Sequence, residues 1–319
     1  MTRRREPLPQ LSGTRYLTDG GVETHLIFNE GHELPQFCAF VLNDSEAGRE
    51  AMRDYYRAYL PIARRAGLPF LFDTNTWRAN PDWGALVGYD ASGLSHAIRT
   101  SVSVCEEVAA EFASEGVSSI ISGMMGPRRD AWKYDAVMTI GEAVDYHAPQ
   151  IEIFADTSAA YVTCLTLTNV PEGVGIARAA EAAGMPVVLS FTLETDGNLP
   201  GGKLLREAIS ETDDLTGGYP AYYMINCAHP VHFDRLAAAD TAGLARVMGL
   251  RTNASAKSHA ELDESPTLDR GDPQDLARRY AGLLGLMPQI RVIGGCCGTD
   301  HHHISAVVDQ LAMQTQGPR

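Results

Sequence analysis

The chain has 319 residues, 45% of them hydrophobic and 21% charged, which is the composition of an ordinary globular protein. Its 26 Lys and Arg against 40 Asp and Glu give a formal net charge of -14, which repels phosphate backbones and argues against a nucleic-acid partner. No run of about 18 apolar residues is present, and no apolar segment follows the basic start MTRRREPLPQ, so neither a membrane span nor a secretory signal is predicted. We therefore expect a cytoplasmic protein with small-molecule partners.

Eight short runs of apolar or β-branched residues are predicted to be strands. In chain order they cover residues 16–21, 68–75, 117–123, 160–167, 185–192, 221–227, 245–253 and 290–295. Helix-like stretches of about ten or more residues lie between most of them, for example at 46–67, 93–116, 171–184 and 272–285. Asn169 and Pro171 at the start of the third stretch, and Gly184 at its end, are typical helix boundaries.

Strand and helix alternating eight times, with strands that are apolar throughout, is typical of a parallel sheet covered by helices. Eight such units predict an α/β protein with a single-domain (β/α)8 barrel over residues 1–319, and a doubly wound open sheet is the second interpretation. Residues 1–12 are expected to be flexible. The first connection, 22–67, is longer than one helix requires, and its segment QFCAFVLN is either an additional strand or a lid.

In a barrel, reactive side chains at the carboxyl ends of strands form the active site. Cys227 ends the sixth predicted strand, and Cys296 and Cys297 end the eighth, in VIGGCCGT. Three thiolates with an open fourth position suit a catalytic zinc ion. Neighbouring residues of a regular strand point to opposite faces, so the two adjacent cysteines can share a metal only if the surrounding glycines let the backbone leave strand geometry.

Other interpretations of the cysteines and histidines remain open. Six cysteines are too few for a disulfide scaffold, and Cys38, Cys105 and Cys164 are read as small buried apolar residues. The adjacent Cys296 and Cys297 could also be a redox pair, although a disulfide between neighbours is strained. The three histidines of DHHHIS are expected to begin the last helix, capped by Asp300 or Thr299, rather than to bind the metal.

The motifs TDGG on the first strand, INC on the sixth and GGCCGT on the eighth together resemble the homocysteine S-methyltransferases, over nearly the whole chain. This resemblance implies a zinc (β/α)8 barrel in which Cys227, Cys296 and Cys297 bind the metal and the homocysteine sulfur takes the open position. It also implies that Asp19, Gly20 and Gly21 lie beside the bound amino acid.

Zinc coordination lowers the pKa of a thiol from about 8.5, so that the acceptor is present as a nucleophilic thiolate. The methyl group must then come from a good leaving group, such as a sulfonium or quaternary ammonium, and aromatic faces suit such cations. Trp77 is predicted to be well placed for this role at the end of the second strand, and Trp132 or Tyr134 could assist.

The sequence departs from the family at three places. The family has Glu-Thr at the end of the fourth strand, where its carboxylate engages the substrate's amino group, whereas this chain has Leu165 and Thr166. On the first strand Glu23 replaces a glycine, in DGGVETHL, and we hypothesise that it supplies the missing carboxylate. Arg78 stands where relatives carry Gln or Tyr, and could meet a substrate carboxylate.

The sequence thus predicts a zinc-dependent S-methyltransferase that moves a methyl group from S-methylmethionine, S-adenosylmethionine or a betaine to homocysteine, giving methionine. The alternatives are a different thiol or selenol acceptor, a vicinal-dithiol redox protein, and a non-catalytic thiol- or zinc-binding barrel. Outside the metal ligands, the predicted substrate-binding residues are Asp19, Gly20, Gly21, Glu23, Trp77, Arg78, Thr166 and Asn226. The methyl donor and the oligomeric state are not predicted.

Overall fold

Eight parallel strands form a closed barrel in the computed structural model, which describes residues 7–130, 137–263, 265 and 267–315. The strands are β1 Tyr16–Thr18, β2 Phe70–Asp73, β3 Ser119–Met125, β4 Tyr161–Leu167, β5 Val187–Thr192, β6 Tyr222–Asn226, β7 Val247–Thr252 and β8 Val292–Gly295. The barrel closes because β1 pairs with β8 as well as with β2, with Tyr16 opposite Val292. All eight predicted strands are present, and the open sheet is excluded.

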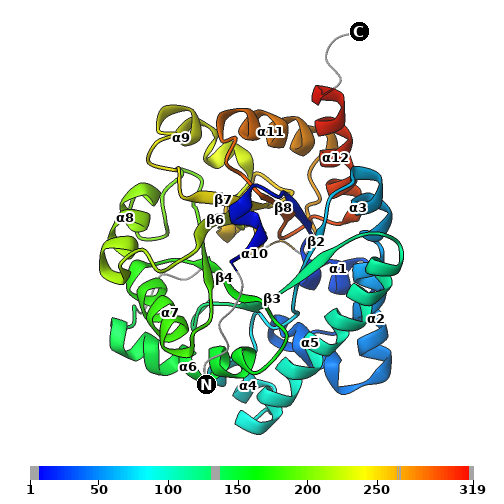
Figure 1. The fold of residues 1–319 in the computed structure, drawn as a ribbon, viewed down its shortest axis with the longest axis vertical. Coiled ribbons are helices and arrows are strands. Elements are labelled where there is room, and N and C mark those ends of the chain that lie inside the picture. The colour runs from blue at the N-terminus through cyan, green and yellow to red at the C-terminus, as the bar shows by residue number, and fades with distance from the viewer. Residues whose placement is uncertain (1–6, 131–136, 264, 266, 316–319) are drawn as a thin grey trace.

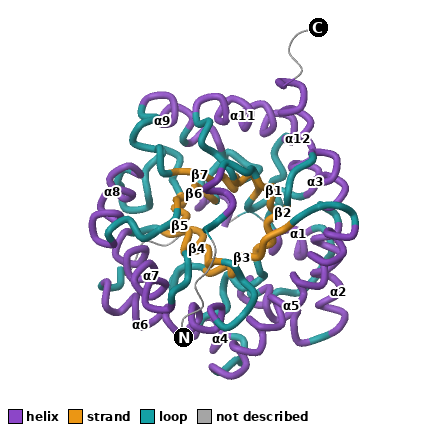
Figure 2. Tube along the Cα trace, viewed as in Figure 1, coloured by secondary structure: helices purple, strands orange, loops and turns teal. Residues whose placement is uncertain are grey.

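Most of the helices form an outer ring around the strands, whereas α10 lies over the middle of the barrel (Figures 1 and 2). The helices are α1 Val22–Phe28, α2 Glu46–Arg57, α3 Leu60–Ala66, α4 Pro81–Leu86, α5 Ala91–Ser114, α6 Ile140–Ala155, α7 Val170–Ala183, α8 Leu205–Thr216, α9 Asp234–Ala239, α10 His259–Asp263, α11 Pro273–Leu286 and α12 His301–Thr315. None of the helices in the described ranges is long and apolar enough to cross a membrane. The predicted (β/α)8 architecture is confirmed.

Helix α7 shows why the predicted boundaries hold. The Asn169 side chain accepts a hydrogen bond from the Glu172 backbone N–H, Pro171 lies in the first turn, and Gly184 ends the helix in a left-handed conformation with φ of 65°. These groups satisfy backbone donors and acceptors that a helix end leaves unpaired.

The first connection differs from the prediction in two ways. The stretch 46–67 is two helices, α2 and α3, because Pro61 lacks the backbone N–H that would continue one helix through this point. The segment QFCAFVLN is not a strand, since it lies in two 3-10 helices, Pro35–Phe37 and Ala39–Asp44.

Apolar side chains fill the space between the barrel and its helices and also the lower part of the barrel interior. At the amino ends of the strands, here called the lower end, the interior is closed by Leu8, Tyr16, Leu71, Tyr161, Val188, Tyr222, Met224 and Val292. The part of segment 1–12 that is described lies there as well, since Gln10 is buried and donates to the Tyr161 hydroxyl. The lower end is therefore packed, and the carboxyl ends of the strands are left to form a cavity.

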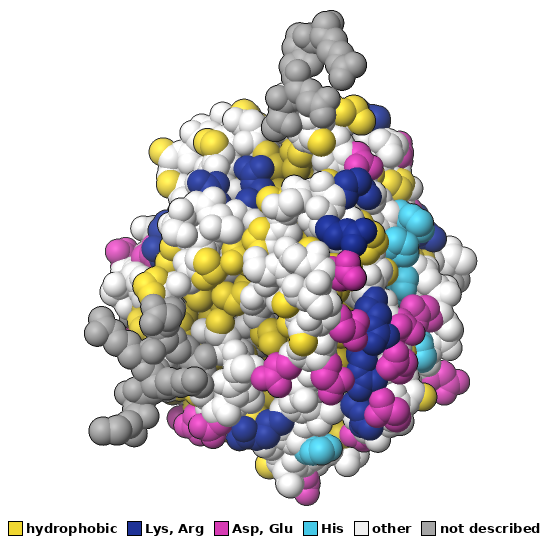
Figure 3. Space-filling view, turned by 45° about the vertical axis from the view of Figure 1, so that its right-hand side comes forward, with side chains coloured by type: hydrophobic (Ala, Val, Ile, Leu, Met, Phe, Trp, Pro, Cys, Tyr) yellow, Lys and Arg dark blue, Asp and Glu magenta, His cyan; other side chains and the backbone are white. Residues whose placement is uncertain are grey.

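Charged side chains of both signs gather on the face that carries α2 (Figure 3). Arg53 and Arg57 of α2 form ion pairs with Glu107 and Glu111 of α5. The four side chains are partly exposed to solvent, so we expect each pair to contribute little to stability. None of these four side chains is among the residues that line the cavity.

Candidate active site

Three cysteine sulfurs meet at the carboxyl end of the barrel. Cys227 follows β6, and Cys296 and Cys297 follow β8. The three Sγ atoms all lie within 4.8 Å of one another, and those of Cys227 and Cys297 are 3.6 Å apart. Within the described ranges no other group of His, Cys, Asp and Glu residues is arranged in this way. The trio can therefore hold a metal ion, as the sequence predicted.

Hydrogen bonds among the three thiols shift their pKa values in opposite directions. Hydrogen bonds with Cys227 and then with Cys297 lower the pKa of Cys296 well below its usual value, and the charge of Arg251 lowers it further. Hydrogen bonding to Cys296 raises the pKa of Cys227, and Cys227 in turn raises the pKa of Cys297. The site thus favours a thiolate at Cys296, which is the form that binds metals.

The glycines around the cysteines act mainly by allowing close approach. Gly298 has a left-handed φ of 78°, but Gly294 and Gly295 do not. A Cβ at Gly294 would collide with the Thr18 methyl group, and one at Gly295 with the Thr299 hydroxyl. Backbone freedom was the predicted role of all three glycines, and only Gly298 uses it.

The turn between β1 and α1 packs directly on the cysteine turn. A Cβ at Gly21 would lie 2.5 Å from the Cys296 carbonyl oxygen, and the Gly21 N–H donates to the Thr299 carbonyl at 3.1 Å. The Gly298 N–H donates to the Thr24 hydroxyl at 3.1 Å. The position of Cys296 and Cys297 therefore depends on this first turn.

We expect Gly21→Ala to destabilise the protein by about 1–3 kcal/mol, because the new methyl group overlaps backbone that cannot move freely. It should also weaken metal binding, since Cys296 must shift. Gly282→Ala is the matched control, because Gly282 is exposed in α11 with no atom within 4 Å of the added Cβ. The control should gain about 0.5–1 kcal/mol. Urea unfolding and metal titration check both; equal stability of the two variants would contradict the prediction.

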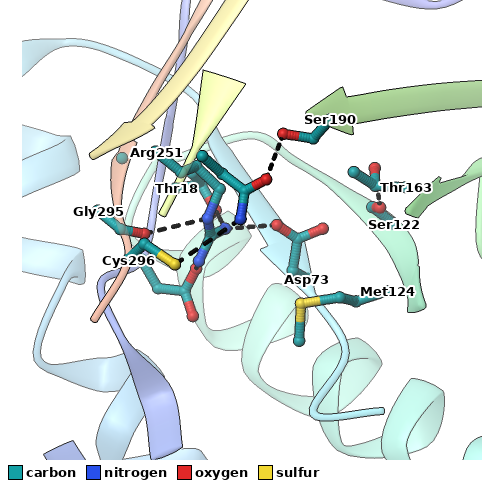
Figure 4. Close-up of polar contacts among 12 residues, drawn as sticks. Thr18, Asp73, Ser122, Met124, Thr163, Ser190, Arg251, Gly295 and Cys296 are labelled. Atoms are coloured by element: carbon teal, nitrogen blue, oxygen red, sulfur yellow. Dashed lines mark hydrogen bonds and ion pairs between the residues drawn. The ribbon is translucent and has the colours of Figure 1, made fainter. Parts of the chain in front are cut away.

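Below the cysteines, Arg251 of β7 pairs with two buried carboxylates (Figure 4). Its guanidinium lies 2.6 Å from Asp19 Oδ1 and 2.5 Å from Asp73 Oδ2, and also donates to the Thr18 hydroxyl and the Gly295 carbonyl. Burial raises the pKa of Asp73 to about 6, against the opposing charge of Arg251. Asp19 was predicted to lie beside the substrate, but it is engaged by Arg251 and is not among the residues that line the cavity.

Asn226 connects the cysteines with β4. Its Oδ1 atom accepts from the Thr166 N–H at 2.8 Å and from the Ser190 hydroxyl at 2.6 Å, and its Nδ2 donates to Cys296 Sγ at 3.8 Å. Thr166 has a left-handed φ of 61°, and its hydroxyl accepts from Trp77 Nε1 at 2.9 Å. These contacts hold the ends of β2, β4, β6 and β8 in one arrangement.

The cavity over the cysteines is largely apolar. It brings together the three cysteines and six of the eight predicted substrate-binding residues, namely Gly20, Gly21, Glu23, Trp77, Thr166 and Asn226. Further walls come from Phe28, Phe37, Met124, Leu165, Leu262 and Leu268. Trp132 and Tyr134 lie outside the described residues. No sequence motif predicted the part of the wall that follows β7, which is formed by Leu262, Ser265, Thr267, Leu268 and Asp269.

Arg78 is buried beside the cavity without lining it. Its guanidinium carbon lies 3.8 Å from the centroid of Trp83 and 4.9 Å from that of Trp77, and it donates to the Gln36 carbonyl. Asp130 lies 3.7 Å away. Trp77, which was predicted to meet a substrate cation, therefore already stacks on the Arg78 guanidinium.

Glu23 differs from the other acidic residues of the site. It lines the cavity, and its Oε1 atom is buried with no hydrogen-bond partner among the described residues. Burial, with smaller contributions from the charges of Cys296 and Asp19, raises its pKa to about 7 against the opposing effects of its own backbone N–H and the Arg78 charge. An unsatisfied buried carboxylate oxygen is costly, which points to a ligand that satisfies it.

The three histidines after the cysteines form the first turn of α12. The Asp300 carboxylate accepts from the backbone N–H groups of His302 and His303, so it caps α12 as predicted. His303 is buried, with its ring bonded to Asp300 and to the Arg270 carbonyl. None of the three histidines is among the residues that line the cavity.

A family model described as homocysteine S-methyltransferase matches residues 16–311. The chain belongs to the homocysteine S-methyltransferase family. The resemblance found in the sequence is confirmed. The matched segment contains β1 to β8 and all three cysteines.

Curated relatives are betaine–homocysteine S-methyltransferases 1. The rat protein (Rattus norvegicus) is 25% identical over 289 residues, which cover 82% of this chain and 64% of the relative. The bovine protein (Bos taurus) is 25% identical over 293 residues, with the same coverage of 82% and 64%. The chain therefore spans somewhat less than two thirds of the length of these members of the homocysteine S-methyltransferase family.

Among solved structures, the chain is similar to the homocysteine methyltransferase MmuM from Escherichia coli. The metallated form has a TM-score of 0.72 at 24% identity, covering 96% of this chain and 100% of that one. The oxidized form has a TM-score of 0.74 at 23% identity, covering 96% and 99%. At this identity the likeness supports the family's barrel fold and leaves the substrates to be argued from the cavity.

Proposed function

We propose that this protein is a zinc-dependent S-methyltransferase that transfers a methyl group to the thiol of homocysteine, giving methionine. The single observation that carries the proposal is the cysteine trio. In a tetrahedral site with zinc–sulfur bonds of about 2.3 Å, two sulfurs lie about 3.8 Å apart. The Cys227 and Cys297 sulfurs are separated by 3.6 Å, and the donor set of three cysteines fits zinc.

A zinc ion held by Cys227, Cys296 and Cys297 would lower the pKa of the acceptor thiol that occupies its fourth position. Side chains of the protein would orient the cysteine ligands and exclude water. Asn226 donates to Cys296 and fixes its orientation, as the outer partners of metal ligands do. The apolar walls formed by Trp77, Leu165 and Leu268 exclude water from the nucleophile.

The donor must carry its methyl group on a sulfonium or quaternary ammonium centre, because a thiolate displaces a methyl group only from a good leaving group. S-methylmethionine, S-adenosylmethionine and a betaine all meet this requirement. The three protein thiolates and one divalent cation carry a net charge of -1, which favours approach of a cationic donor. A reducing compartment such as the cytoplasm would keep the three thiols free.

The test combines metal analysis with a screen of methyl donors and acceptors. We expect about one zinc per chain and conversion of homocysteine to methionine with at least one of the three donors. Cysteine, other thiols and selenols serve as alternative acceptors in the same screen. A metal-free protein with a reversible disulfide among the three cysteines would support the redox alternative, and zinc-loaded protein without product from any pair would contradict methyl transfer.

A further inference from the structure

Glu23 is the acidic residue whose surroundings distinguish it from the other carboxylates near the cysteines. Asp19 and Asp73 are both engaged by Arg251, at 2.6 and 2.5 Å. Asp269, which also lines the cavity, accepts from Ser255 at 2.9 Å and lies 3.0 Å from Lys257 Nζ. Their charges are therefore compensated within the protein.

One oxygen of the Glu23 carboxylate has no such compensation. Its Oε1 atom is buried, and no donor among the described residues reaches it. The opposite wall offers no second carboxylate, because Leu165 is apolar and Thr166 uses its hydroxyl to donate to the Leu165 carbonyl and to accept from Trp77. Glu23 therefore offers an unpaired carboxylate oxygen to a cationic group that enters this cavity.

We propose that Glu23 binds the primary ammonium group of an amino-acid thiol acceptor, and so selects homocysteine-like thiols over thiols without an amine. This inference rests on the proposed function for the identity of the bound thiol. The acceptor would lie with its sulfur at the cysteine trio and its ammonium toward the turn between β1 and α1, on the side of the barrel away from Leu165.

The chemistry of the free oxygen favours a primary ammonium group over the onium centre that carries the methyl group. A buried carboxylate oxygen lacks a hydrogen bond, and a primary ammonium has three N–H donors. A sulfonium or quaternary ammonium has no N–H group and would leave Oε1 unsatisfied. The raised pKa of Glu23, about 7, fits a group that becomes fully ionised only when a cation is beside it.

The experiment measures thiol binding without any methyl donor. Homocysteine and its analogue without the amine, 4-sulfanylbutanoate, are titrated into the metal-loaded protein by calorimetry, and into the cobalt-substituted protein with the thiolate-to-metal absorption as readout. Glu23→Gln should weaken homocysteine binding by about 10- to 100-fold and leave the affinity for the analogue within about threefold. Glu23→Asp, which keeps the charge but shortens the side chain, should fall between.

Asp269→Asn is the matched control, because Asp269 lines the same cavity but is already paired. It should leave the ratio of the two affinities unchanged. Equal weakening of both thiols by Glu23→Gln, or no change in either, would overturn the inference. In a separate titration with each methyl donor, a loss of donor affinity in place of acceptor affinity would also overturn it, since Glu23 would then face a cationic group of the donor.

The failure of this inference can be told from failure of the proposed function. Methylation of homocysteine with the same KM in the wild type and in Glu23→Gln would remove the role of Glu23 and leave methyl transfer intact. Binding of homocysteine that depends on Glu23, without turnover by any donor, would support the ammonium site and contradict methyl transfer. Circular dichroism of each variant checks that it is folded, and Glu23→Asp keeps the test valid if the Gln variant is not.

Discussion

Cys227→Ser is expected to release the metal and reduce methyl transfer by more than about 100-fold, because changes to the outer partners of metal ligands alone cost 10–100-fold. Serine keeps the size of the side chain but its hydroxyl is not a thiolate donor. Cys227 comes from β6 and its two partners follow β8, so neither of the adjacent cysteines can replace it. Metal content after dialysis and the rate of methionine formation measure the result.

Cys164→Ala is the matched control for this variant. Cys164 is a buried cysteine of β4 and is not part of the trio. Its replacement should cost some stability by leaving a small cavity, yet the protein should keep about one metal per chain. Equal metal loss in both variants would mean that the metal is bound elsewhere or that folding, and not coordination, has failed.

Arg251→Met is expected to destabilise the protein by about 3–5 kcal/mol. The change keeps an unbranched side chain but leaves Asp19 and Asp73 as uncompensated buried carboxylates, and removal of one partner from a buried ion pair is strongly destabilising. Urea unfolding at pH 7 gives the free energy of unfolding of both proteins.

The pH dependence of this loss identifies its cause. With Arg251 present the pKa of Asp73 is about 6, and without it burial raises that pKa further, so the added cost is present above about pH 6 and disappears as the pH falls and the group becomes protonated. The deficit should therefore shrink between pH 7 and pH 4. The triple change Asp19→Asn, Asp73→Asn, Arg251→Met should recover most of the stability, and a deficit that is constant with pH would point to lost packing instead.

The barrel and the cysteine trio could be predicted because both depend on local patterns. Eight apolar runs separated by helix-like stretches give eight strands, and strand ends in a closed barrel must face one rim. Where a local signal was overlooked, as at Pro61, one predicted helix was really two.

The partners of the charged residues could not be predicted in the same way. Asp19 and Arg251 are 232 positions apart and become neighbours only when β1 and β7 lie on the same barrel. Arg78 finds Trp83 through a turn whose shape no motif encodes. Arg251 lies within the apolar run ARVMGLRTN, and a charged residue in such a run indicates a buried counter-ion. Which carboxylates it pairs with depends on the closed barrel.

The contacts of Gly21 and Thr24 with the cysteine turn lie at the seam where β8 meets β1. The three cysteines are therefore positioned by contacts between the first and last strands of the barrel. A chain in which only seven strands have docked would have the three thiols but not their arrangement. Such pairing of distant segments is a slow and late event in folding. If the trio binds zinc as proposed, tight metal binding should consequently mark the moment at which the barrel closes, and the ion would report completed folding.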